Sequence, residues 1–249
     1  MSVHSKSSGV LSGNHINIIR GIDTHMVTHG KRSIQLTLFL ITFFILWTLR
    51  CAFFYTVDES IASPAVRAAY SNLLKFLVWI LPAAVFVYVL RGTNPVKYFG
   101  LSVWPSRRNW LMSISLITAY LLVVALFKIV IDNKRFSTTF FSTIPFTYWL
   151  IMALLPPFLE ELFFRGFLIT ELLALIPVHL AIVTSSFLFA CIHLPYWLSQ
   201  GALIQTVAVS GSAAFAFSIL TGWLFVKTGS IWPSVLAHFA ANLLPQFFV

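Results

Sequence analysis

Charged residues are scarce in this sequence of 249 residues, at 9%, and only seven of them are Asp or Glu. Soluble domains carry about a quarter charged residues and about half apolar ones. Here apolar residues make up 59% of the chain, and the mean hydropathy is +0.89. This composition excludes an ordinary soluble domain, so lipid must surround most of the chain.

The chain also lacks a polar segment that could fold and present its net charge of +9 to a nucleic acid. The basic residues instead flank apolar runs, as do Lys31, Arg32, Arg91, Lys97, Arg107 and Arg108. Positive charge in such places holds loops on the cytoplasmic side and contacts anionic lipid. We therefore expect membrane lipid as a partner and no nucleic acid.

Cysteine is nearly absent. Cys51 and Cys191 lie in or beside apolar segments, which excludes a disulfide framework and a zinc site of three or four thiolates. We interpret both as packing residues.

Residues 1–33 have neither a signal-peptide core nor helical periodicity. The segment is polar and holds four scattered histidines, and Met26 is a second candidate start. We expect a disordered cytoplasmic leader, followed by a single transmembrane domain over residues 34–249.

Long apolar runs predict membrane helices, because a span needs about 20 mostly apolar residues and unpaired backbone groups are unfavourable in lipid. The predicted fold is all-α, a polytopic transmembrane helical bundle of about seven to eight helices. Pro177 and His179 interrupt one run, and residues 195–202 have the composition of a re-entrant piece, so six also stays open. The seven runs lie near residues 34–55, 73–90, 110–131, 146–168, 174–194, 203–226 and 230–248.

The distribution of Lys and Arg predicts a cytoplasmic N-terminus. An N-in arrangement places the leader, the loop 91–109 and Lys227 inside, and leaves few basic residues outside. Lys75 and Lys128 lie near predicted helix ends, from which they can snorkel. The aromatic and basic stretch 94–110 is typical of a segment at the headgroup level.

Ionisable residues are rarest in the C-terminal half, where a charge at membrane depth indicates function by default. Between Arg135 and Lys227 the only charged residues are Glu160, Glu161, Arg165 and Glu171. Glu161 and Arg165 are one helical turn apart with the acid first, the favoured order for a pair. Glu160 is rotated by about 100° from Glu161, so it can face a neighbouring helix.

Three further polar residues extend this pattern. His193 follows Phe189 by one turn, and His238 and Asn242 share one face of the last run. Each residue taken alone could be a hydrogen-bonding contact between helices, and the acidic pair could be a buried ion pair that joins helices. A single polar cavity would satisfy all of them together.

Such a cavity favours general-base hydrolysis of a peptide bond. A carboxylate facing an imidazole can hold and deprotonate water, and N–H donors on the His238 and Asn242 face can stabilise an oxyanion. A serine mechanism fits less well, because Gly-x-Ser-x-Gly is absent and Ser210-Gly211-Ser212 has no histidine at a recognisable spacing.

The three motifs Glu160-Glu161-x-x-x-Arg165, Phe189-x-x-x-His193 and His238-x-x-x-Asn242 resemble the signature of the CAAX protease and bacteriocin-processing (CPBP, or Abi) intramembrane proteases. The likeness covers about residues 145–245, which would be the catalytic core. It implies that Glu160 and His193 activate water, Glu161 and Arg165 form a supporting pair, and His238 and Asn242 stabilise the oxyanion. We expect Glu171 and His179 to be interfacial.

The resemblance implies an endopeptidase that acts on a peptide or protein, either a prenylated CAAX protein or a bacteriocin-like peptide. We expect no cofactor, although Glu160, His193 and His238 could bind a divalent metal such as zinc. The alternative function is a non-catalytic membrane immunity or scaffold protein. A transporter fits less well, since no paired broken helices occur in corresponding halves. The oligomeric state stays open.

Overall fold

A computed structural model describes residues 29–54, 57, 60–138 and 153–249. Within these ranges the regular elements are all helices, and the one pairing of strand type is an isolated antiparallel bridge between Phe136 and Phe248. The predicted all-α class is therefore confirmed. Most of the predicted leader lies outside the described residues, but residues 29–33 are already helical.

The N-terminal half forms three long helical runs. In the second run, α4, the π-helical η2 and α5 follow one another without a break over Pro64–Arg91. The elements are α2 (His29–Phe53), α4 (Pro64–Lys75), η2 (Phe76–Ile80), α5 (Leu81–Arg91), the short α6 (Pro95–Tyr98) and α7 (Arg107–Val130).

The C-terminal half carries the motifs on shorter helices. The elements are α10 (Leu155–Glu161), the π-helical η4 (Leu162–Ile169), α11 (Thr170–Leu173), α12 (Val178–Cys191), α13 (Leu194–Ser199), α14 (Ile204–Thr228), α15 (Trp232–Leu243) and the 3-10 turn η5 (Leu244–Phe247). Elements α10, η4 and α11 form one continuous helical run.

Five helical runs are long and apolar enough to cross a membrane, among the residues that the structure describes. They correspond to five of the seven predicted spans and identify a membrane protein. The other two are the run 155–173, whose predicted N-terminal part lies outside the described residues, and α15 with η5. These two shorter pieces carry the first and third motifs.

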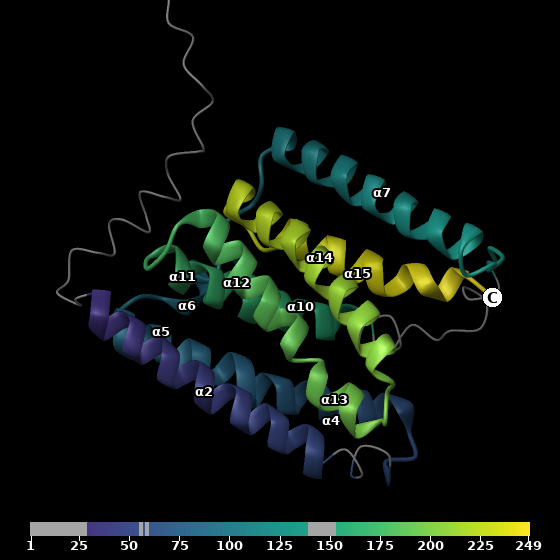
Figure 1. Ribbon diagram of the computed structural model, residues 1–249. Coiled ribbons are helices and arrows are strands. Elements are labelled where there is room, and N and C mark those ends of the chain that lie inside the picture. Colours follow the sequence, from purple (N-terminus) through teal and green to yellow (C-terminus); the bar gives the residue numbers. More distant parts are fainter. Residues whose placement is uncertain (1–28, 55–56, 58–59, 139–152) are drawn as a thin grey trace, which may run out of the picture.

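The continuous run of α10, η4 and α11, called the motif helix below because it carries the first motif, lies at the centre of the bundle. In Figure 1, α2, α4 and α5 lie on one side of α10 and α12, and α14, α15 and α7 lie on the other. All eight residues of η4 are buried. Phe163 stacks on Phe43 of α2 at 4.4 Å between ring centroids, and Phe164 meets Trp79 of η2 edge-on at 6.0 Å. The two halves of the chain therefore share one aromatic core.

Glu171 is fully buried, which corrects its predicted place at the membrane interface. Arg91 donates to both of its carboxylate oxygens at 2.9 Å, Arg32 donates at 3.3 Å, and the Tyr98 hydroxyl donates at 2.5 Å. Arg32 and Arg91 thus bind a carboxylate within the bundle, whereas the sequence predicted contacts with lipid headgroups. Burial and the neighbouring Glu171 raise the pKa of Tyr98 well above its usual range, so it stays a neutral donor.

This cluster ties the far end of the motif helix to the first helices of the chain. Its residues come from α2, α5, α6 and α11. His179, the other residue expected at the interface, is exposed. Because η4 and α11 are continuous with α10, the cluster also limits sliding of the helix that holds Glu160.

We expect Glu171→Ala to lower the free energy of unfolding by about 3–5 kcal/mol, because it leaves two buried guanidinium groups without their carboxylate. Asp132→Ala is the matched control, since its ion pair with Lys128 is about one-third exposed on each side and is worth less than about 1 kcal/mol. Thermal unfolding of both variants in detergent measures the difference. Equal melting temperatures would show that the ion pairs of Glu171 do not stabilise the fold.

Candidate active site

The acidic pair lies at the end of α10, which begins at Leu155 with Pro156 and Pro157 in its first turn. Proline is tolerated there because the first helical N–H groups have no intrahelical acceptor. Just after the pair, the helix changes to the π form of η4, an arrangement that is frequent at functional sites.

Glu161 is fully buried between two partners. Its Oε2 lies 3.0 Å from Nε of Arg165, so the predicted pair forms, and its Oε1 lies 2.7 Å from Nδ1 of His238. Glu161 therefore also orients the histidine of the third motif, as a carboxylate orients the histidine in a catalytic triad.

Arg165 also contacts α14 and α12. It donates to the hydroxyl groups of Ser218 and Thr221 on α14, and its guanidinium lies 4.8 Å from the ring centre of Phe189. The serine and threonine could not be assigned from the sequence, because isolated hydroxyls are common in membrane helices. Together these contacts fix the base of the site.

Phe189 organises the second motif through both its backbone and its ring. Its carbonyl oxygen lies 3.0 Å from Nδ1 of His193, and its ring contacts His193 and His238 at centroid distances of 5.2 and 5.7 Å. A bond from Nδ1–H to a carbonyl leaves Nε2 of His193 as the acceptor. Next to it, the carbonyl of Ile192 accepts a hydrogen bond from the Trp47 indole at 2.8 Å.

Glu160 has a partner that the sequence did not predict. Lys75 at the end of α4 donates to its Oε1, while its Oε2 lies 3.7 Å from Nε2 of His238. The side chains of Lys75 and Glu160 are 14% and 10% exposed. Lys75 was expected to snorkel from a helix end, but the helical run begins at Pro64, so the residue lies inside it.

The structure thus brings together Glu160, Glu161, Arg165 and His238, and His193 lies within electrostatic range of Glu160. Asn242 is exposed, one turn beyond His238, and no hydrogen bond joins it to the cluster. Its side chain is free to meet a molecule that approaches the site.

The metal alternative does not fit these side chains as they stand. Among the described residues, no group of three or more His, Cys, Asp or Glu side chains is arranged to hold a metal ion. Of the candidate ligands, Glu160 is already paired with Lys75.

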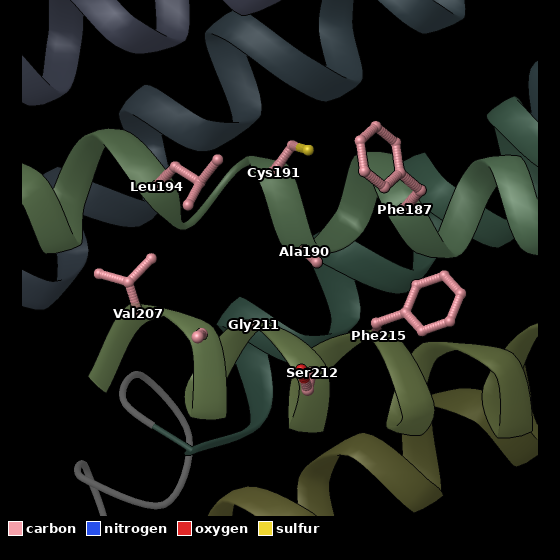
Figure 2. Close-up of a pocket in the computed structure, with 9 residues that line it drawn as sticks. Phe187, Ala190, Cys191, Leu194, Val207, Gly211, Ser212 and Phe215 are labelled. Carbon is pink, nitrogen blue, oxygen red and sulfur yellow. The ribbon is translucent and has the colours of Figure 1, made fainter. Parts of the chain in front are cut away.

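An open apolar groove of about 360 Å³ lies between the end of α12, with Leu194 at the start of α13, and the first half of α14. Figure 2 shows residues of the two walls facing each other across it. Cys191 and Leu194, which flank the histidine turn, belong to the lining, and so do Phe187, Ala190, Val207, Ala208, Gly211, Ser212 and Phe215.

The helical bundle thus holds two buried glutamates and a histidine bound to one of them, with a second histidine nearby. Residues 142–244 match the family model described as "Type II CAAX prenyl endopeptidase Rce1-like". This match confirms the predicted resemblance to the CAAX proteases, and the description of the model is that of an endopeptidase. No curated protein and no solved structure gives a match to the chain.

Gly166, next to Arg165, allows the motif helix to pack against the chain before α7. A Cβ at this position would lie 2.8 Å from Cβ and 2.9 Å from the carbonyl oxygen of Phe99. These are fixed atoms that cannot move aside without shifting the backbone.

We expect Gly166→Ala to lower the free energy of unfolding by about 1–3 kcal/mol through overpacking. Gly211→Ala is the matched helical control, since its Cβ would meet only Trp197, at 3.7 Å, and alanine favours a helix. Melting curves of the two variants test this. A Gly166 variant as stable as the Gly211 variant would show that the contact with Phe99 is not tight.

Proposed function

We propose that the chain is an intramembrane endopeptidase of CAAX type, which hydrolyses a peptide bond close to a prenylated residue. The observation that carries this proposal is the convergence of both glutamates on His238 inside the family segment. The family match favours CAAX processing over bacteriocin processing, and a non-catalytic immunity role would leave the contacts of both glutamates with His238 without a function.

In the proposed reaction, Glu160 accepts a proton from water, which His193 holds through Nε2. The water oxygen bonds to the scissile carbonyl carbon, and the carbonyl oxygen becomes an oxyanion. The carbon–nitrogen bond then breaks, and Glu160 returns the proton to the leaving amine.

The remaining residues hold this arrangement. Glu161 accepts a hydrogen bond from Nδ1–H of His238, and the doubly protonated imidazole then donates to the oxyanion through Nε2. Asn242 supplies a second donor as the substrate binds. Arg165 holds Glu161 in place through their ion pair. Each step is assigned to side chains of this chain, without a metal ion.

The apolar groove suits the lipid part of such a substrate. Pockets for small ligands have volumes of about 300–1,000 Å³ and mostly apolar walls. The groove meets both conditions, and its lining includes Cys191 and Leu194, which come before and after His193 in the chain. Its exposed lining residues include Ala208 and Ser212. A prenyl chain in this groove would place the adjoining peptide next to the histidine.

We expect Glu160→Gln to lower kcat on a prenylated CAAX peptide by about 100- to 10,000-fold, which is the usual contribution of a general base. Purified protein in detergent, with product release followed by mass spectrometry, measures this. Asp132→Asn, far from the motifs in sequence and outside the cluster, should keep wild-type turnover. If Glu160→Gln cleaves the peptide as fast as the wild type, Glu160 is not the base.

We expect Ala208→Phe to raise KM for a prenylated peptide by about tenfold, because each CH₂ group that loses its contact is worth about 0.8 kcal/mol. Ala213→Phe is the matched control, since Ala213 is exposed on the same helix but does not line the groove. The same peptide without the prenyl group should be indifferent to both changes. An equal rise in KM for both peptides would exclude the groove as the lipid site.

A further inference from the structure

Lys75 is the one member of the cluster that the proposed reaction does not use. It belongs to the run Pro64–Arg91, an apolar segment in which an internal charge is unfavourable without a partner. Its ammonium group donates to Glu160 and lies 5.2 Å from the ring centre of Trp79, one turn further along. A cation held in this way next to the base can bind an anionic group of the substrate.

The charges of the cluster balance while the site is at rest. Arg165 matches Glu161, and Lys75 matches Glu160. When Glu160 takes a proton from water, its charge is lost and Lys75 is left as a buried ammonium without a counter-ion. A second carboxylate near Lys75 would restore the balance at the moment when the base is protonated.

A CAAX-type substrate brings such a carboxylate with it. The bond to be cleaved lies three residues before the C-terminus, so the free α-carboxylate is at most about 10 Å away along an extended chain. Lysine has a flexible four-carbon stem and a compact charge, so it can turn from Glu160 toward a nearby anion.

The other cations of the site are poorly placed for this task. Arg165 is completely buried against Glu161 and α14, whereas the Lys75 side chain retains 14% exposure. Arg91 and Arg32 are bound to Glu171 in the separate cluster at the far end of the motif helix. Lys75 is therefore the cation of the active-site cluster that an entering anion can reach.

We propose that Lys75 binds the free C-terminal carboxylate of the substrate, taking it in place of Glu160. The exchange selects substrates that end close to the scissile bond, and it frees the Glu160 oxygen that Lys75 occupies at rest. This inference rests on the proposed function and assigns to it a specificity-determining residue.

The test compares two prenylated peptides of identical sequence, one ending in a free acid and the other in a carboxamide. The measured quantity is the ratio of kcat/KM for acid over amide in full-length protein. We expect the wild type to favour the acid by about 10- to 100-fold, as for a charge-assisted hydrogen bond. Lys75→Met should bring the ratio close to one, and Lys75→Arg should keep most of it.

Lys128→Met is the matched control, because Lys128 is an exposed lysine paired with Asp132 on α7; it should keep both the ratio and the turnover. A purely structural role of Lys75 would lower both rates and leave the ratio unchanged, which would overturn the proposal. A wild type that cleaves both peptides equally would overturn it as well.

If Lys75→Met turns over neither peptide, the ratio is read from binding of uncleavable acid and amide analogues to that variant. Equal Kd values support the proposal, and a retained preference for the acid overturns it. Failure of the proposed function looks different, because wild type and Glu160→Gln would then be equally inactive on both peptides.

Discussion

Every strongly buried acidic group in the described bundle is matched by a cation, and the arrangement of helices follows from this constraint. A carboxylate in an apolar interior is unfavourable unless a partner lies against it. Glu161 is paired with Arg165, Glu171 with Arg32 and Arg91, and Glu160 with Lys75. The first pair is local to one helix. The other two connect distant helices, so they restrict how α2, α4 and α5 can lie around the motif helix.

The positions of the apolar segments and the Glu161–Arg165 pair could be predicted from the sequence, because composition and a spacing of four residues are local properties. The partners of Glu160 and Glu171 could not, because they lie 85 and up to 139 residues away in the chain. One local signal was available for Lys75. Ser63 caps the helix through its side chain and Pro64 follows, a typical helix start, which places Lys75 inside the run and makes a partner necessary.

The aromatic core explains why the acidic pair can be held in a fixed position. The residues of η4 are buried on all sides, with Phe163 and Phe164 packed against two neighbouring elements. Functional side chains keep their geometry best when packing restrains the element that bears them. The site has its carboxylates at the start of this restrained segment and its histidines on the surrounding helices.

The hydrogen bond from Trp47 to the carbonyl of Ile192 joins the first described helix to the turn that carries His193. Trp47 and Lys75 lie outside the segment 142–244 that matches the family. The matched segment therefore does not contain the whole site. The turn with His193 contacts Trp47, and Glu160 contacts Lys75, and both partners come from the N-terminal half of the chain. A chimera that keeps the three motifs but exchanges α2 would have to replace the Trp47 contact, and one that exchanges α4 would have to replace the Lys75 contact.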